Sequence, residues 1–287
     1  MTPQPEQLGL AGMPTRLFAA TPSKLGSFDD CPRRYRFTYV DRPRPPKGPP
    51  WAHNSVGASA HNALRAWWDL PRRRRSSEAA GSLVDSGWLV EGFRDAEQSA
   101  QWRATVRQWV TSYAATLDPD DEPPGLERTV STTTQRLAVQ GRVDRVDERD
   151  GECVVVDYKT GRRPLDTDDA RGSQALALYV LGVRRTLHRP CSRVELHHLP
   201  TGTVAGWDHT EESLGRHVRR AENTAADILL ATEAQAAGAD EDDAWPARPG
   251  MQCGFCDYRR NCAPGMAAGP ARDPWFALTA VTPAVSE

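Results

Sequence analysis

The stretch "GRVDRVDERDGECVVVDYK", residues 141–159, alternates apolar and polar side chains on both sides of the dipeptide Asp150-Gly151. Such alternation is typical of two β-strands, and an Asp-Gly pair between them predicts a two-residue hairpin turn. With those two residues as the turn, counting outward places Asp144 directly opposite Asp157. The sequence therefore predicts an antiparallel hairpin that holds two carboxylates face to face.

Lys159 lies two positions beyond Asp157 and shares its face of the strand. Lysine is scarce in this chain, with three residues against 33 arginines. Two opposed carboxylates are unfavourable unless a cation lies between them, and Mg²⁺ or Mn²⁺ prefers such oxygen ligands. An ammonium can lose its proton when desolvated, which a guanidinium cannot do, so Lys159 suits a role beside a metal-activated water. The alternative is a surface hairpin whose Asp and Lys form an exposed salt bridge.

The composition indicates a single cytoplasmic domain with insertions. The chain has 287 residues and a formal net charge of −2. No stretch approaches 18 apolar residues, and no basic start precedes an apolar run, so we expect neither a membrane span nor a secretory signal.

Charge is distributed unevenly along the chain. Residues 31–75 contain eleven Lys or Arg and two acids, whereas "GADEDDAW", residues 238–245, is acidic. This asymmetry predicts one basic surface, from Arg33 to Arg75, that tracks a nucleic-acid backbone. The alternative is that "PRRRR", residues 71–75, is a solvated loop.

Periodicity predicts an α/β fold in the order α-β-β-β-α-β, followed by one more strand and a helix. We expect one domain at residues 21–265, with a helical insertion at about 65–120 and a cysteine loop at 250–265. Residues 1–20 and 266–287 are expected to be loose tails, and Ser23 is a candidate cap of the first helix. The expected strands are 126–132, 136–146, 152–159, 193–199 and 202–208, and the main later helices are 173–188 and 211–236.

Three motifs together carry a family resemblance. Asp144 in "GRVDRVD", with Asp157 and Lys159 in "VVVDYKTG", resembles motifs II and III of the PD-(D/E)xK nucleases, specifically the RecB-like exonuclease branch. That branch also carries a helical histidine, and "GASAHNAL" supplies His61 in a similar G-x3-H-x2-L setting. The resemblance spans roughly residues 21–265 and implies a restriction-endonuclease-like core.

The resemblance also implies roles for individual residues. His61, Asp144 and Asp157 would bind Mg²⁺ or Mn²⁺, with the backbone carbonyl of Tyr158 as a further ligand. Glu127, in the strand before Asp144, would be an accessory acid.

One further family motif fits less well. Relatives carry a Gln-x3-Tyr helix after motif III, whereas Gln174 and Tyr179 here are five positions apart. Five positions correspond to 140° of separation on a regular helix at about 100° per residue. Both side chains therefore face the site only if the helix starts irregularly.

The cysteines suggest a second metal centre. Cys253, Cys256 and Cys262 are spaced C-x2-C-x5-C, and Cys31 is the candidate for a fourth ligand. The other two cysteines, at positions 153 and 191, are candidates for buried thiols. Spacing alone fits either a Cys₄ zinc site or an iron–sulfur cluster.

The same cysteine pattern, with "CPRRYRF" around Cys31, resembles the iron–sulfur subgroup of the RecB-like branch, which includes AddB-type and CRISPR-associated RecB-like nucleases. The resemblance implies a structural [4Fe–4S] cluster that joins the N-terminal and C-terminal segments like a staple.

Taken together, the sequence predicts a metal-dependent DNA nuclease that acts on single strands or DNA ends, in repair, recombination or CRISPR adaptation. The chain has no complete Walker A loop, so a helicase partner would be a separate chain, as would CRISPR adaptation proteins. The main alternative is a non-catalytic iron–sulfur DNA-binding subunit of a helicase–nuclease complex. A zinc protein of unrelated function is the third.

Overall fold

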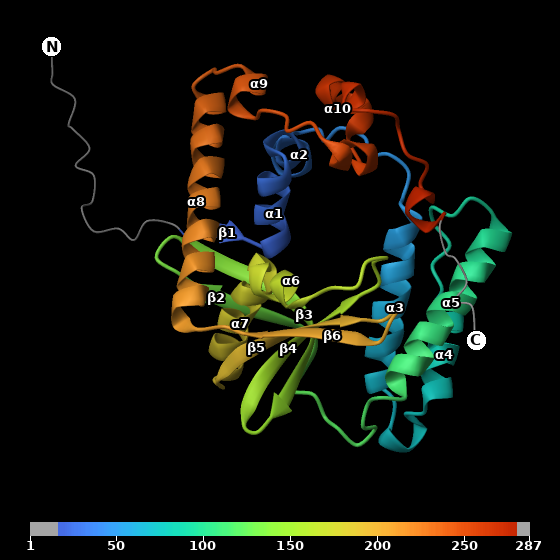
Figure 1. The fold of residues 1–287 in the computed structure, drawn as a ribbon. Helices are drawn as coiled ribbons and strands as arrows, with labels where there is room; N and C mark the ends of the chain where they lie inside the picture. Colours follow the sequence, from blue (N-terminus) through green and yellow to red (C-terminus); the bar gives the residue numbers. More distant parts are fainter. Residues whose placement is uncertain (1–16, 280–287) are drawn as a thin grey trace, which may run out of the picture.

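The computed structural model describes residues 17–279, which form a mixed sheet with helices packed around it (Figure 1). This is the expected α/β class, with one strand more than the sequence predicts. The strands are β1 Phe18–Ala20, β2 Gly125–Thr133, β3 Leu137–Arg149, β4 Glu152–Lys159, β5 Cys191–His198 and β6 Thr203–Asp208. The α-helices are α1 Pro22–Asp30, α2 Pro32–Tyr35, α3 Ala52–Trp68, α4 Ser77–Ser86, α5 Ala96–Ala114, α6 Thr167–Gly172, α7 Gln174–Leu187, α8 Glu211–Ala236, α9 Glu241–Ala244 and α10 Ala263–Ala267.

The long strand β3 organises the sheet. It pairs antiparallel with β2 and β4 and parallel with β1, while β4 pairs parallel with β5, and β5 antiparallel with β6. The parallel step from β4 to β5 requires a crossover, which α6 and α7 supply. Strands from both halves of the chain therefore meet at β3 and β4.

The predicted hairpin register is confirmed. Arg149 pairs with Glu152 and Arg145 with Val156, a register that continues to Asp144 opposite Asp157. The two turn residues have φ of 53° and 83°, as a two-residue turn with left-handed central residues requires.

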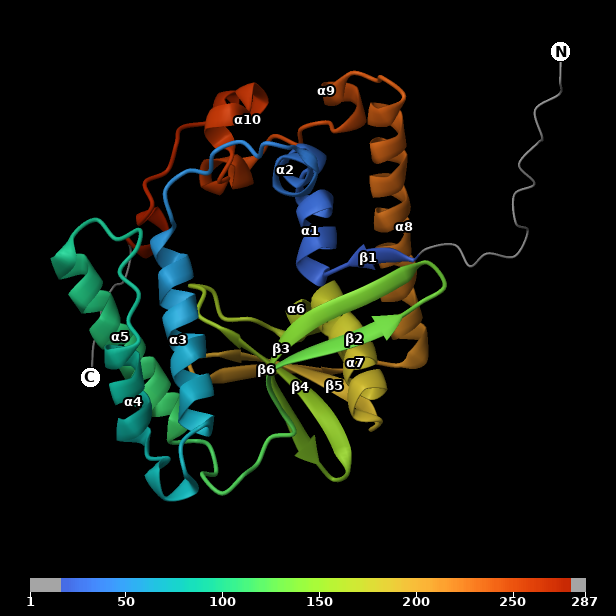
Figure 2. The ribbon, with the colours of Figure 1, turned by 180° about the vertical axis from the view of Figure 1, so that it is seen from behind.

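Alternate residues of β4 contact different helical layers. Val154, Val156 and Tyr158 belong to a core cluster built with α3, α4 and α5. Val155 belongs to a second cluster built with α7. Figures 1 and 2 show these helices on opposite sides of the sheet, with α1 and the long α8 at its β1 end. Because successive side chains of a strand point to opposite faces of the sheet, β4 packs against a helical layer on each face.

The chain packs beyond the boundaries expected from the sequence. Residues 18–20 form β1, where Phe18 pairs with Leu137, and Thr21 rather than Ser23 caps α1 by accepting a hydrogen bond from the N–H of Lys24 at 3.0 Å. At the other end Leu278 is buried in the cluster with α3. Three residues of extended chain and a few C-terminal apolar side chains have too little periodicity to be recognised in isolation. The remainder of the expected tails, residues 1–16 and 280–287, lies outside the described residues.

The expected continuous basic surface from Arg33 to Arg75 is wrong in part. Arg33 contacts Asp242 and Arg36 pairs with Glu241 at 2.7 Å, so the acidic α9 lies against the basic α2. Arg75 is buried and donates to backbone carbonyls, including that of Trp68 at 2.8 Å. The acidic cluster therefore neutralises part of the basic stretch, at Arg33 and Arg36.

Gly141 marks a close approach between β3 and α7. A Cβ atom at this position would lie 2.3 Å from Cε1 of Tyr179, which is far inside van der Waals contact. We therefore expect Gly141→Ala to displace Tyr179 and to lower the free energy of unfolding by about 1–3 kcal/mol. Chemical denaturation measures this, with Gly172→Ala as the control because a Cβ there meets nothing within 4 Å. Equal unfolding midpoints for the two variants would contradict this packing.

His209 provides a pH-dependent contribution to stability. It is 4% exposed, and its Nδ1 lies 2.8 Å from the Ser213 hydroxyl. Burial, helped by His217 and Arg184, lowers the pKa of His209 to about 4, against about 6.5 for an unfolded histidine. The unfolded chain therefore binds more protons between these values, so this contribution is present above pH 6.5 and is lost as pH falls toward 4.

We expect the stability difference between wild type and His209→Gln to shrink by up to roughly 3 kcal/mol as pH falls from 7 to 4. Urea denaturation at a series of pH values measures it. Parallel pH profiles for the two proteins would show that His209 is not held neutral by the fold.

Candidate active site

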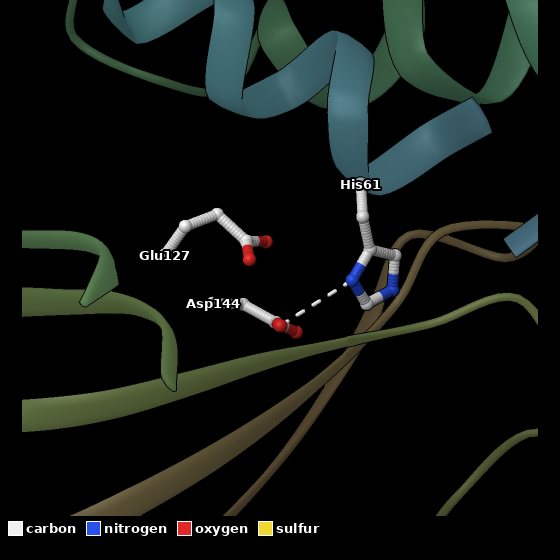
Figure 3. A group of neighbouring side chains, drawn as sticks. All are labelled: His61, Glu127 and Asp144. Carbon is white, nitrogen blue, oxygen red and sulfur yellow. Dashed lines mark ion pairs between the residues drawn. The ribbon is translucent and has the colours of Figure 1, made fainter. Parts of the chain in front are cut away.

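Three side chains from three separate elements converge beside the β3–β4 hairpin. His61 comes from α3, Glu127 from β2 and Asp144 from β3, and one ligand atom from each lies within 4.8 Å of the other two. Figure 3 shows the carboxylates of Glu127 and Asp144 directed toward the imidazole of His61, which extends down from α3. Packing of α3 against β4 in the shared core cluster holds the helix over the strands.

The backbone of Tyr158 fixes two members of this group. Its N–H donates to Asp144 Oδ2 at 2.9 Å, and its carbonyl lies 3.1 Å from His61 Nε2. His61 Nδ1 is in turn 3.3 Å from Asp144 Oδ1. Burial opposes protonation of His61, but the hydrogen bond and charge of Asp144 outweigh it and raise the pKa of His61. One backbone position thus sets the orientation of both side chains.

Glu127 adopts a strained backbone conformation. Its φ is 43°, a region that non-glycine residues rarely occupy and that often marks functional sites. Its neighbours in β2 pair with Arg145 and Val143, so Glu127 lies opposite Asp144. Burial, together with the charge of Asp144, raises the pKa of the Glu127 carboxyl. The residue expected as an accessory acid therefore lies within the three-residue group.

Asp157 and Lys159 form an ion pair next to this group. Lys159 Nζ contacts Asp157 Oδ2, and the Asp157 side chain is 19% exposed. Within residues 17–279, Asp157 is not part of a three-residue group as compact as that of His61, Glu127 and Asp144.

The pKa values of the two opposed carboxyls, Asp157 and Asp144, are shifted in opposite directions. Burial, helped by the charge of Asp144, raises the pKa of Asp157. Burial also opposes ionisation of Asp144, but His61 and the Tyr158 N–H outweigh it, so the pKa of Asp144 is lowered. Environments that separate the pKa values of paired carboxyls are typical of active sites.

The donor set fits a divalent cation. An imidazole nitrogen and two carboxylate groups converge, with the Asp157 carboxylate and the Tyr158 carbonyl close by. Such an oxygen-rich, negatively charged set suits Mg²⁺ or Mn²⁺, whereas sites for softer metals use thiolates. The arrangement has the chemistry of a metal-dependent hydrolytic site.

The two residues of the helical motif behave differently. Tyr179 packs against Gly141, and burial, with the charges of Asp157 and Asp144, raises the pKa of Tyr179 to about 12. Gln174 is the first residue of α7, and its amide nitrogen is buried without a hydrogen-bond partner in the described chain. Tyr179 therefore lies close enough to feel the charges of the site carboxylates, and a role in the site stays a prediction for both Gln174 and Tyr179.

The four candidate ligand cysteines line one small cavity. Cys31, at the start of α2, and Cys253, Cys256 and Cys262, in the loop before α10, contribute to its wall. The N–H of Arg248 lies 3.5 Å from Cys31 Sγ, and a Cβ at Gly265 would lie 3.3 Å from Cys262 Sγ. The cavity thus joins segments more than 200 positions apart. The other two thiols, at positions 153 and 191, are buried partners in β4 and β5, as expected.

Comparison with known proteins identifies the fold family. The family model of the PD-(D/E)XK nuclease superfamily matches residues 19–263. No curated protein matches the chain significantly. Among solved structures, a candidate exonuclease from Eubacterium rectale is similar over 61% of this chain and 82% of its own, with 11% identity and a TM-score of 0.32. Residues 17–279 contain no helix that could span a membrane.

Proposed function

Because the chain belongs to the PD-(D/E)XK nuclease superfamily, we propose that it is a metal-dependent deoxyribonuclease that hydrolyses phosphodiester bonds beside His61, Glu127 and Asp144. The observation that carries this proposal is the convergence of these three ligands next to the Asp157–Lys159 pair. A surface hairpin with an exposed salt bridge would not bury its carboxylates under a helix. The proposed chemistry is hydrolysis by in-line attack of water.

The residues of the site divide the work. His61, Glu127 and Asp144 would hold Mg²⁺ or Mn²⁺, with Asp157 and the Tyr158 carbonyl within reach of the same position. The bound cation would acidify a water molecule and neutralise charge on the phosphate. Lys159 would orient the attacking water and offset the negative charge that builds on the phosphate oxygens. The backbone N–H and carbonyl of Tyr158 hold the Asp144 carboxylate and the His61 imidazole in their relative orientation.

We assign the enzyme to the RecB-like exonuclease branch, acting on single-stranded DNA or DNA ends in the cytoplasm. The motifs around His61, Asp144 and Lys159 support this assignment. A separate helicase or CRISPR adaptation proteins would supply the DNA, in repair, recombination or spacer acquisition.

Cleavage of end-labelled DNA tests the function. Single-stranded, blunt and tailed duplex substrates are incubated with purified protein in Mn²⁺ and, in parallel, in excess chelator. We expect metal-dependent loss of nucleotides from the ends of the single strand. Binding without cutting on every DNA form would instead favour a non-catalytic iron–sulfur DNA-binding subunit.

We further propose that the cysteine cavity holds a [4Fe–4S] cluster. What supports the proposal is the common cavity, whose wall includes Cys31 from the start of α2 and Cys253, Cys256 and Cys262 from the C-terminal segment. Four thiolates are the ligand set of such a cluster. Gly265 approaches this wall closely, since a Cβ there would lie 3.3 Å from Cys262 Sγ.

Metal analysis after anaerobic purification distinguishes an iron–sulfur cluster from a zinc site. We expect a coloured protein that contains iron, and we expect Cys31→Ser and Cys253→Ser to lose both the colour and the iron. Because the cavity joins α2 to the C-terminal loop, these variants should also unfold at a lower temperature. Cys153→Ser is the control outside the cavity, and it should retain the iron. A colourless wild-type protein that contains zinc would overturn the cluster.

A further inference from the structure

Arg142 presents a guanidinium group beside the candidate metal site. It lies on β3 two residues before Asp144, and its side chain is 71% exposed. Its Nε lies 2.8 Å from Glu127 Oε2. A guanidinium has five N–H donors, and this contact uses only the one on Nε. The two terminal amino groups therefore remain available while the carboxylate holds the side chain in place.

Arg65, on helix α3, carries a second guanidinium group near the metal site. It lies four residues after His61 on α3, so both side chains share one face of the helix. Its side chain is 57% exposed, and its contact with Asp69 is 3.8 Å, which is longer than a hydrogen bond. The charges of Arg65 and Arg142 both act on Glu127. Two guanidinium groups thus influence one member of the metal group, Arg142 from β3 and Arg65 from α3.

The environment of Arg65 separates it from other arginines of the basic stretch. Arg36 and Arg75 are buried and held by ion pairs or backbone carbonyls, so they are not available to a ligand. The pair of Arg65 with Asp69 is exposed on both sides, and such a contact contributes only about 0–1 kcal/mol. A phosphate can take two parallel hydrogen bonds from a guanidinium and forms charge-assisted bonds roughly twice as strong as neutral ones. An arriving phosphate would therefore outcompete the present contact of Arg65 with Asp69.

We propose that Arg142 and Arg65 form a phosphate clamp that binds a backbone phosphate adjacent to the bond being cut. This inference rests on the proposed nuclease function and names the group that its site recognises. Glu127 links the two parts, because one carboxylate belongs to the metal group and also anchors Arg142. The clamp positions the strand, whereas the reacting atoms belong to the metal group and Lys159.

Single-turnover cleavage of a labelled single strand, measured at increasing protein concentration, tests the clamp. This experiment separates the half-saturating concentration, which reports binding, from the maximal rate, which reports chemistry. We expect Arg142→Gln and Arg65→Gln each to raise the half-saturating concentration about tenfold, the equivalent of one charge-assisted hydrogen bond. The maximal rate should change less than about threefold. The slope of log affinity against log salt should fall by about 0.7 for each variant.

The matched control is Arg216→Gln. Arg216 on α8 has the same 57% exposure as Arg65 and a similar pairing with an acid one helical turn away, Glu212. It should leave both kinetic parameters and the salt slope unchanged.

Two results would overturn the clamp in an active enzyme. One is an unchanged half-saturating concentration in both arginine variants, and the other is a loss confined to the maximal rate. Failure of the wild type to cut any DNA would be a different result, since it would remove the proposed function itself.

Discussion

Lys159→Ala should abolish cleavage while leaving the fold intact. Lys159 Nζ contacts Asp157 beside the group of His61, Glu127 and Asp144, where a water and the phosphate would meet. Losing a positioned charge or proton donor at such a site typically costs about 10²–10⁴-fold in rate. The single-turnover rate of cleavage in Mn²⁺, together with the thermal unfolding midpoint, measures both parts of this expectation.

Two other variants sharpen the test of Lys159. Lys159→Arg keeps the positive charge but cannot release a proton, so partial recovery would indicate an electrostatic role and no recovery a proton-transfer role. Lys47→Ala is the matched control, because Lys47 is a 60% exposed lysine paired with Asp257 away from the β3–β4 hairpin. Cleavage by Lys159→Ala at the same rate as by Lys47→Ala would contradict the proposed mechanism.

Asp144→Asn should have the second large effect. The carboxylate interacts with His61 Nδ1 and accepts the Tyr158 N–H, so it occupies the centre of the group. An amide of the same size removes one of the negative charges that a divalent cation requires. We expect a loss of cleavage of at least about 10³-fold that added Mn²⁺ does not restore. Rates measured over a wide range of Mn²⁺ concentrations test this.

Asp147→Asn is the control within the same strand. Asp147 pairs with Arg145 at 2.7 Å and with Arg149 at 2.9 Å, and it lies outside the metal group. Because Arg145 is buried, this variant should lower the free energy of unfolding by about 3–5 kcal/mol. The fraction that remains folded should still cut DNA. If Asp144→Asn behaves in the same way, losing stability but not activity, Asp144 is a structural residue.

The hairpin and its residues were predictable because their determinants are local. An Asp-Gly turn with alternating flanks sets the register over a dozen residues, and Asp144 and Asp157 follow by counting. The long helix α8 was likewise predicted with its observed bounds of residues 211–236, since its amphipathic pattern extends over many turns.

The position of Glu127 was not predictable to the same degree. The Glu127 side chain reaches His61 and Asp144 because Glu127 itself has a left-handed φ of 43°. Neither the composition nor the hydrophobic periodicity of the sequence indicates such a local distortion. The clue available in the sequence is its place in the strand before Asp144. Arg142 was missed altogether, although its two-residue offset from Asp144 predicts the same face of β3.

Long-range pairing accounts for the other differences. β1 has only three residues and finds its partner near Leu137, more than a hundred positions away. The acidic α9 follows the long helix α8 in the chain and pairs with Arg33 and Arg36, which lie about two hundred positions earlier. Local patterns cannot reveal such contacts, and the overestimated basic surface is the direct consequence.

Calorimetric titration of the DNA-free protein with Mn²⁺ measures the affinity of the metal site independently of cleavage. We expect chelator-reversible binding to wild type that is absent in Asp144→Asn, weakened in Glu127→Gln and retained in Lys159→Ala. Equal Mn²⁺ affinity in wild type and Asp144→Asn, or no binding to wild type, would contradict a metal site at His61, Glu127 and Asp144.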